Sequence, residues 1–293
     1  KISDANWASK SQISVYKVIM NSEYWDSMKR QWIQMEEEVR KAFSTKKKMQ
    51  VYDYKTNGYK SVSMTPLDSI KFHRKHMQSG MLAIEPSTGY VKAWVGGYNH
   101  QVFQYDHVNS NRQVGSTFKP FVYSTAIFHQ GISPCWRVDD VQYSIPAKDR
   151  NFGLLKKWSP SNANNKFSGE SLTLYEGLRQ SKNSVSVYLM KELGNVEVVR
   201  EMASNMGIPK SKIPNAPSIC LGTPELSLMD MTSAYSTFAN NGIHNEPIFV
   251  TRIEDKDGQL IYSAVPEQSK ALPADYNYVM VSMLKNAASF ISG

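Results

Sequence analysis

A serine and a lysine three positions apart, Ser116 and Lys119, have the residue types and spacing for nucleophilic catalysis without a histidine. A serine hydroxyl at its ordinary pKa is a weak nucleophile and needs a base within hydrogen-bond reach. Positions i and i+3 share one face of a helix, and Pro120 is tolerated in the first turn of that helix. Burial of the lysine amine would disfavour its charged form, so the neutral amine could accept the serine proton. The pair therefore indicates acyl transfer through a serine ester.

A second pair of polar residues, Ser181 and Asn183, lies downstream and supplies the groups that such a site still needs. Ser181 would relay a proton between Lys119 and the leaving amine, and Asn183 would hold a substrate amide with its side chain. Lys182, between them, would point away as a structural residue. The competing interpretation is a polar turn that caps a helix beginning near Ser184. The sequence alone leaves both open.

The Ser-x-x-Lys spacing is weak evidence when it stands alone, because it also occurs at Ser44/Lys47 and Ser282/Lys285. The former pair lies in a lysine-rich run, and the latter lies on a late helix without a companion motif. Ser116 differs because a glycine precedes it and an apolar helix follows. A helix N-terminus carries a partial positive charge that favours a developing oxyanion, and the backbone N–H of this serine is a candidate oxyanion donor.

The composition limits the classes of protein that remain. The 293 residues suffice for one large domain or two smaller ones, and 41% hydrophobic with 20% charged residues is ordinary for a globular protein. The densest basic clusters, 46–48 and 73–76, contribute to a net charge of +8. No nucleic-acid-binding signature accompanies them, so we expect no nucleic-acid partner. A solvated face, or one beside an anionic membrane or polymer, explains the charge better.

We expect no metal and no cofactor, since the six histidines lack zinc-site spacing and no glycine-rich phosphate loop is present. Cys135 and Cys220, 85 positions apart, neither require nor exclude a disulfide. No apolar run reaches the length of a membrane span, and no signal peptide is present. Lys1 in place of a methionine predicts a fragment, from which a membrane anchor would have been lost.

The pattern of hydrophobic residues predicts helices combined with antiparallel hairpins, which together make an α+β fold. The helix after Gly115 would end at Gly131, and the irregular stretch 132–170 has a length that tends to carry function. Thr223 would cap the helix 225–240. The remaining predicted elements are helices over 24–43, 171–179, 184–193, 195–206 and 273–289, a strand over 49–54 with a turn at 55–58, and hairpins over 81–85 with 90–97 and 248–253 with 259–263.

Three segments resemble class A, bifunctional penicillin-binding proteins: 112–121 around Ser116, 176–183 around Ser181, and 221–242. A Ser-x-x-Lys element followed by a Ser-x-Asn element marks penicillin-binding proteins and related β-lactamases. The resemblance runs from about residue 64 to the end. It implies an interdomain linker or small module over 1–64 and a transpeptidase domain over 65–293, incomplete at its C-terminus. The implied fold is the penicillin-recognising serine transpeptidase fold, an antiparallel sheet with helical lobes.

The resemblance also implies an activity, that of a D,D-transpeptidase that cross-links peptidoglycan. Ser116 would attack the penultimate D-Ala carbonyl of a stem peptide, with Lys119 as base, Ser181 as relay and Asn183 as substrate clamp. β-Lactams would mimic the D-Ala-D-Ala donor and trap the serine, which makes the protein an antibiotic target linked to resistance. A glycosyltransferase domain and membrane anchor would precede the chain, and the domain would work on the periplasmic side of the bacterial cytoplasmic membrane.

The third motif of the family, Lys-Thr/Ser-Gly, does not occur in the 293 residues; the nearest match, 55–58, carries an extra asparagine in the wrong part of the chain. In the family this motif lies on a sheet-edge strand after a helix like the one ending near Ser289. We therefore expect a truncated or nicked chain whose 81–95 hairpin lacks three further strands. Such a segment would acylate slowly or not at all, and rapid stoichiometric labelling by a fluorescent penicillin would refute this.

Two alternatives remain open. A β-lactamase or penicillin sensor would use the same serine, and a lactamase also needs a base for the deacylating water, for which Glu170 and Glu176 are the nearest candidates. A non-catalytic module that binds cell-wall polymer or a partner would explain the missing third motif. A long-lived penicilloyl adduct favours the transpeptidase, turnover favours the lactamase, and an intact function in Ser116→Ala favours the binding module.

Overall fold

The computed structural model describes residues 23–53 and 55–292. Contacts within the chain divide it into two units, one up to Met77 and one from Gln78 onward. The division predicted from the sequence, between residues 64 and 65, falls inside the first unit just before its last helix.

The first unit contains helix α2 (Glu23–Ser44), the antiparallel strands β1 (Lys47–Asp53) and β2 (Gly58–Met64), and helix α3 (Pro66–Arg74). The predicted helix and strand are thus confirmed, although Tyr54 lies outside the described residues. Helix α3 begins with Pro66 at its first position, while the Thr65 side chain accepts the Asp68 N–H, a standard N-cap.

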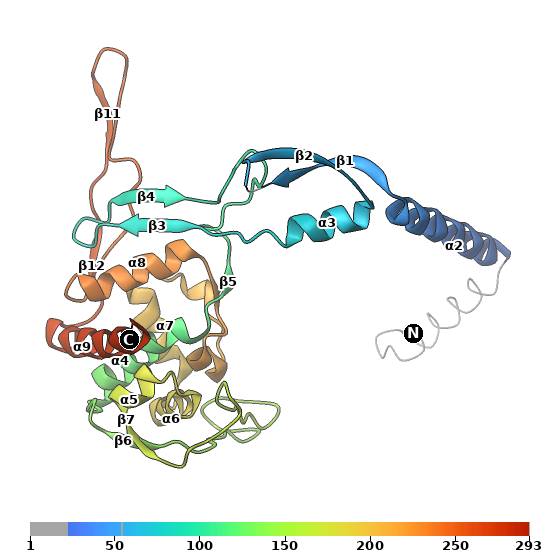
Figure 1. Ribbon diagram of the computed structural model, residues 1–293. Helices are drawn as coiled ribbons and strands as arrows, with labels where there is room; N and C mark the ends of the chain where they lie inside the picture. Colours follow the sequence, from blue (N-terminus) through green and yellow to red (C-terminus); the bar gives the residue numbers. More distant parts are fainter. Residues whose placement is uncertain (1–22, 54, 293) are drawn as a thin grey trace. The chain divides into compact units, whose positions relative to one another are not determined.

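The second unit is built around helix α4 (Lys119–Gln130), which lies among the other helices of this unit in Figure 1. Its residues from Lys119 to Ile127 are all buried. Helices α6 (Asn183–Leu193), α7 (Val196–Asn205) and α9 (Ala274–Ser292) pack against it. Gly131 ends α4 in a left-handed conformation with φ of 63°, as its residue type predicts. The core therefore surrounds the helix that carries Lys119.

Antiparallel strands β3 (Met81–Ile84) and β4 (Val91–Val95) form the predicted hairpin, and β3 packs on helix α8 (Leu228–Ala239). Within 23–53 and 55–292 every sheet has two strands. Trp94 and Val95 remain 36% and 48% exposed. The hairpin thus has a helix on one side and an incompletely covered surface elsewhere.

The stretch predicted as irregular, 132–170, contains one short strand, β6 (Arg137–Asp139). It pairs with β7 (Ser171–Thr173), which closes the long loop at its base. Helix α5 (Leu174–Arg179) begins three residues later than predicted, because Thr173 forms a reciprocal capping box with Glu176. The loop ends where the helices of the site begin.

The predicted cap of the helix over 225–240 is wrong. Helix α8 begins at Leu228 with Ser227 as its N-cap, whose side chain accepts the Asp230 N–H. The residues before it form strand β8 (Glu225–Leu226), which pairs with β5 (Arg112–Gln113). Thr223 instead shares a hydrogen bond with Ser218. Pairing with a distant strand therefore overrides the local helix signal.

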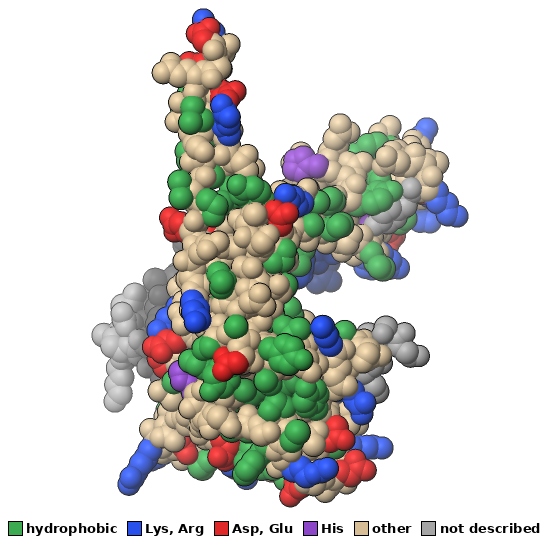
Figure 2. Space-filling view, turned by 90° about the vertical axis from the view of Figure 1, so that its left-hand side faces the viewer, with side chains coloured by type: hydrophobic (Ala, Val, Ile, Leu, Met, Phe, Trp, Pro, Cys, Tyr) green, Lys and Arg blue, Asp and Glu red, His purple; other side chains and the backbone are tan. Residues whose placement is uncertain are grey.

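The second predicted hairpin is formed by β10 (Arg252–Glu254) and β11 (Leu260–Ser263), the upper projection in Figure 2. Hydrophobic side chains are exposed along it, and charged residues occupy its tip. The remaining elements are β9 (Ile243–Asn245) paired with β12 (Gln268–Lys270), and the short 3-10 helices η3 (Lys210–Lys212) and η4 (Pro217–Leu221). None of the helices among the described residues is long and apolar enough to cross a membrane.

Candidate active site

Ser116 lies in a 3-10 turn, η2 (Gly115–Phe118), that leads directly into α4. The sequence predicts a helix here, and the structure has a tighter 3-10 turn. Ser116 and Lys119 still share one face, because side chains at i and i+3 eclipse one another in that geometry. The Lys119 N–H donates to the Ser116 carbonyl oxygen and closes this turn. Ser116 is exposed to solvent, whereas Lys119 is completely buried. The nucleophile candidate is therefore at the surface of the site and the base candidate is inside it.

A close approach of two glycines fixes the position of the turn. The Gly115 N–H donates to the Gly222 carbonyl oxygen at 2.9 Å, and Gly222 has a left-handed φ of 80°. A β-carbon on Gly222 would lie 1.6 Å from the Gly115 oxygen. Only glycine can occupy position 222 with this backbone. No spacing rule in the sequence indicates this contact.

Tyr235 holds the turn from helix α8. Its hydroxyl donates to the Thr117 carbonyl oxygen at 2.7 Å, and its ring packs edge-on against Phe121 and Phe238. Burial raises the pKa of Tyr235, so the hydroxyl stays a donor. The residue next to the nucleophile candidate is thereby tied to the core.

The buried Lys119 amine donates to three neutral oxygens: the Ser181 carbonyl at 2.6 Å, the Ser181 hydroxyl at 3.1 Å and Asn183 Oδ1 at 2.8 Å. In the described part of the chain none of its hydrogen-bond acceptors is a carboxylate. Burial lowers the pKa of Lys119 to about 8, with a smaller opposing effect from the nearby Cys220 thiol. Three acceptors suit the three N–H groups of an ammonium; the neutral amine would release one and expose a lone pair.

Ser181 occupies a strained turn between α5 and α6. Its φ of 51° is left-handed, which costs a non-glycine residue about 1–2 kcal/mol. The Ser181 N–H donates to the Leu178 carbonyl and the Lys182 N–H to the Gly177 carbonyl. This conformation directs both the carbonyl and the hydroxyl of Ser181 at the Lys119 amine. Strain of this kind is typical of functional turns.

The Asn183 side chain uses both ends of its amide. Its oxygen accepts from Lys119, and its nitrogen donates to the Ser161 carbonyl at 2.8 Å. Each end keeps one further hydrogen-bonding position, one N–H and one lone pair. The side chain is therefore held in place while it retains capacity for a substrate amide.

The structure joins Lys119, Ser181 and Asn183 in one hydrogen-bonded cluster. The predicted Ser116 occupies the eclipsed position before Lys119 and is not among the three acceptors of its amine. Lys182 points away from this cluster, as predicted, and forms an ion pair of 2.7 Å with the buried Asp140. The sequence did not single out Asp140, Asn162 or Ser161, and the signal for them was the irregular stretch 132–170 that contains all three. Gly222 and Tyr235 lie in the segment 221–242 that resembles the family, but their contacts with the Ser116 turn were not predicted.

Two cavities border these elements. One of about 530 Å³ lies beside the nucleophile turn, and one of about 380 Å³ contains Ser181. The larger is lined by His107, Ser110, Arg112, Gln113, Val114, Thr117, Leu226, Ser227, Leu228, Met231, Thr232 and Tyr235. The smaller is lined by Asn162, Ala163, Asn164, Arg179, Gln180, Ser181 and Lys182. Both hydroxyl-bearing turns are thus reachable from outside.

No group of His, Cys, Asp or Glu side chains that could hold a metal occurs among residues 23–53 and 55–292. Cys135 and Cys220 are free thiols, the former exposed and the latter buried.

Residues 79–286 match the penicillin-binding protein transpeptidase domain family, and residues 4–77 match the penicillin-binding protein middle domain family. Because the former match covers well over half of the sequence, the chain belongs to the penicillin-binding protein transpeptidase domain family. The predicted class and the predicted α+β transpeptidase fold are confirmed.

Among curated relatives, penicillin-binding protein 1A of Neisseria meningitidis serogroup A is 35% identical over 185 residues, which are 63% of this chain and 22% of that protein. The chain therefore spans about a fifth of the length of the curated relatives it matches.

Solved structures support the fold. Penicillin-binding protein 1A from Haemophilus influenzae superposes with a TM-score of 0.64 at 19% identity, over 81% of this chain and 37% of that one. The PonA1 protein from Mycobacterium tuberculosis in complex with penicillin V gives 0.62 at 22% identity, over 90% of this chain and 70% of that one.

Proposed function

We propose that this protein is a serine D,D-transpeptidase that cross-links peptidoglycan stem peptides through an acyl-enzyme on Ser116. The observation that carries the proposal is the buried Lys119 amine, held by Ser181 and Asn183 with neutral oxygens as its acceptors. Burial lowers its pKa to about 8, so a useful fraction is neutral near pH 7–8 and can act as a base.

In the acylation step the neutral Lys119 amine accepts the proton of the Ser116 hydroxyl. At the same time the Ser116 oxygen forms a bond to the carbonyl carbon of the penultimate D-Ala. Collapse of the tetrahedral intermediate breaks the peptide bond to the terminal D-Ala. The leaving nitrogen receives its proton from the Ser181 hydroxyl, which is replenished by the Lys119 ammonium. Asn183 holds the donor peptide with its remaining N–H and lone pair.

In the second step an amine from a neighbouring peptidoglycan strand attacks the ester carbonyl. Its proton passes to the Lys119 amine, and the released Ser116 oxygen recovers a proton from the same group. Donor and acceptor are therefore both peptidoglycan stem peptides, and a β-lactam enters as a mimic of the D-Ala-D-Ala donor. The complex of the M. tuberculosis protein with penicillin V supports this ligand class.

The same proposal places the domain on the outer side of the bacterial cytoplasmic membrane, where its polymer substrate lies. A membrane anchor and a glycosyltransferase domain in the same protein fit the class A pattern that the sequence resembles. The basic composition, a net charge of +8, suits work beside an anionic polymer or membrane.

Mass spectrometry after exposure to penicillin tests the assignment. The protein, expressed from its complete gene, should gain one penicilloyl group on the peptide that contains Ser116. Ser116→Ala should abolish the adduct. Ser282→Ala should retain it, because the Ser282 hydroxyl forms a hydrogen bond with Tyr175 on another helix and not with Lys119. An adduct on another residue, or one that persists in Ser116→Ala, would contradict the proposal.

The lactamase alternative is less well supported. Glu176, one candidate for activating the deacylating water, uses its carboxylate to accept the Thr173 N–H and hydroxyl in a helix cap. Glu170 is exposed in the loop that precedes β7. An adduct that persists for hours would agree with the transpeptidase, whereas catalytic turnover of penicillin would favour the lactamase. A non-catalytic binding module would keep its function in Ser116→Ala.

A further inference from the structure

One buried carboxylate, Asp140, lies outside the proposed chemistry yet is bound to the turn that carries Ser181 and Asn183. It follows strand β6 and has no exposed surface. Its Oδ1 accepts from Asn162 Nδ2 at 2.7 Å and from the Ser184 hydroxyl at 2.6 Å. Its Oδ2 accepts from Lys182 Nζ at 2.7 Å and from the Ser168 N–H and hydroxyl at 3.1 and 3.0 Å. Both oxygens therefore act only as acceptors.

The charge of Asp140 is stabilised by this arrangement. Burial by itself would raise the pKa of the carboxyl, but the hydrogen bonds from Lys182, Ser184, Ser168 and Asn162 outweigh it and hold the pKa well below its usual range. A buried carboxylate with five donors is a rigid point of attachment, because loss of a neutral donor leaves a buried acceptor unsatisfied and loss of Lys182 leaves a buried charge unpaired.

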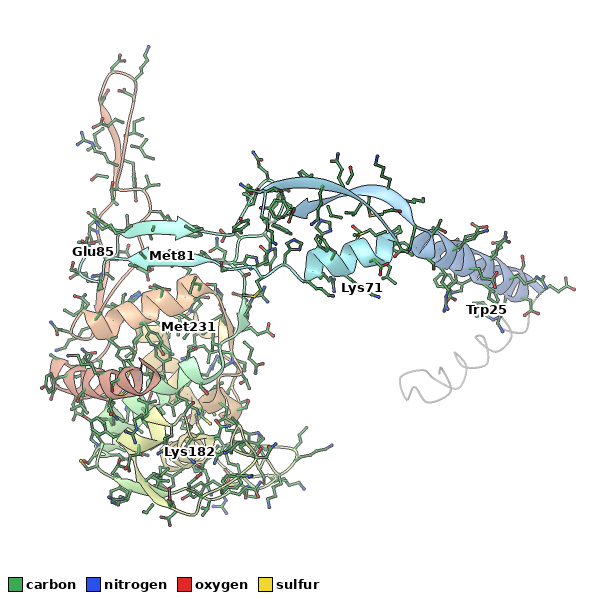
Figure 3. All side chains as sticks on the ribbon, in the orientation of Figure 1. Trp25, Lys71, Met81, Glu85, Lys182 and Met231 are labelled. Atoms are coloured by element: carbon green, nitrogen blue, oxygen red, sulfur yellow. The ribbon has the colours of Figure 1, made fainter. Side chains whose placement is uncertain are left out.

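Two routes lead from Asp140 to the site. Along the first, the ion pair holds Lys182, the residue between Ser181 and Asn183, and so fixes the direction of the strained turn. Lys182, the N-cap residue of α6, is labelled in Figure 3. Along the second, Asp140 orients Asn162, whose Oδ1 accepts the backbone N–H groups of Asn183 and Ser184 at 2.9 and 3.2 Å. The first N–H groups of a helix lack partners within it, so Asn162 anchors the start of α6.

We propose that Asp140 is a positioning residue for the Ser181–Asn183 turn, acting through Lys182 and Asn162 to set the hydroxyl and amide that contact Lys119. The inference rests on the proposed function for its kinetic consequence. Within the described structure no hydrogen bond or ion pair joins Asp140 to Lys119 or Ser116, so its effect is on geometry. The strained turn of Ser181 is held by hydrogen bonds to Lys119 and, through Lys182 and Asn162, by the Asp140 carboxylate.

The substitution Asp140→Asn tests this with little change in volume. One oxygen becomes an NH₂ group that faces donors, and Lys182 loses its counter-charge. The matched control is Asp139→Asn, at the exposed neighbouring position. A further variant, Asp140→Asn combined with Lys182→Gln, removes both charges and should recover part of the loss, because the cost comes from the unpaired ammonium.

Two measurements on the protein expressed from its complete gene decide the outcome. The first is the dependence of acylation on β-lactam concentration, which separates initial binding from the acylation rate constant. The second is amide hydrogen exchange at Asn183 and Ser184, compared with amides inside α4. We expect Asp140→Asn to lower the acylation rate constant at least about tenfold and to speed exchange at the two amides, while α4 stays protected and Asp139→Asn behaves like the parent.

Acylation at the parental rate in Asp140→Asn would overturn the inference. Slower acylation accompanied by faster amide exchange inside α4 would also overturn it, because that result indicates general unfolding. If no variant or parent forms an adduct on Ser116, the proposed function fails, and the exchange measurement still decides the positioning role. Faster exchange confined to Asn183 and Ser184 then supports it, and unchanged exchange refutes it.

Discussion

Two lysines meet at the turn of Ser181 and Asn183, and their surroundings differ: Lys119 reaches the turn from helix α4, and Lys182 is part of it. Lys119 is fully buried and donates to a carbonyl, a hydroxyl and an amide oxygen. The Lys182 side chain is 18% exposed and donates to the Asp140 carboxylate. Burial without a counter-charge lowers the pKa of the Lys119 amine, whereas the Lys182 ammonium has the Asp140 carboxylate as its partner. The comparison shows how one residue type can be held by neutral oxygens, as the proposed base Lys119 is, or by a carboxylate, as Lys182 is.

The largest expected effect is on the base. Lys119→Met should lower the acylation rate constant by about 10²–10⁴, the usual contribution of a general base, because no other amine contacts Ser181 and Asn183 in the described structure. Stopped-flow measurement with a fluorescent penicillin gives the rate, and thermal unfolding should show a smaller loss than in Lys182→Met. Near-parental acylation would remove Lys119 from the mechanism.

The same lysine predicts the pH dependence of the parent protein. Since burial lowers the pKa of Lys119 to about 8, the amine is mostly protonated below that pH and mostly neutral above it. Acylation should therefore rise with pH through about 8 and then level off. A profile that is flat between pH 7 and 9 would contradict the assignment of Lys119 as the base.

Loss of the ion pair between Lys182 and Asp140 should lower mainly the free energy of unfolding. Lys182→Met leaves the buried Asp140 without its ammonium partner, although its four other hydrogen bonds remain. We expect the free energy of unfolding to fall by about 1.5–3 kcal/mol, the value of a hydrogen bond to a charged group. Denaturant unfolding measures this, with Lys156→Met, at an exposed loop position, as control. Equal stability of the two variants would refute the ion pair as a tie.

The smallest effect is expected where the turn of Ser116 meets helix α8. Tyr235→Phe removes one hydrogen bond, to the Thr117 carbonyl, and keeps the ring packing against Phe121 and Phe238. One such hydrogen bond has a net value of about 0.5–1.5 kcal/mol. Where this whole amount is added to the activation free energy of acylation, the reaction slows by up to about tenfold. Tyr278→Phe, on a side chain that is 75% exposed, is the control. An effect as large as that of Lys119→Met would mean that Tyr235 takes part in the chemistry.

The sequence predicted the catalytic candidates because their chemistry requires fixed residue types at short spacings. Lys119, Ser181 and Asn183 are such residues, and the structure brings them together, while the roles assigned to them stay predictions. Asp140 and Asn162 could not be found in this way. Both residues lie in the irregular stretch 132–170, which has no periodicity. Their hydrogen bonds join them to each other and to the start of α6, across about 20 to 40 residues of sequence.

The fold was predictable to the extent that local signals decide it. Gly131 marks the end of α4 because a left-handed residue ends a helix, and the hairpin of β3 and β4 follows from its turn. The start of α8 was wrong by three residues, since Glu225 and Leu226 pair with a strand more than a hundred residues earlier. The left-handed conformation of Ser181 carries no mark in the sequence, because its cause lies in the groups that surround it.

The contact between Gly115 and Gly222 has a consequence for how the protein is made. The two residues are separated by 107 positions, and the hydrogen bond between them helps to fix the turn that carries Ser116. While the ribosome is still translating the segment before residue 222, this contact cannot exist. The turn that carries Ser116 therefore reaches its final geometry only after residue 222 has been synthesised, so its assembly belongs to a late stage of folding.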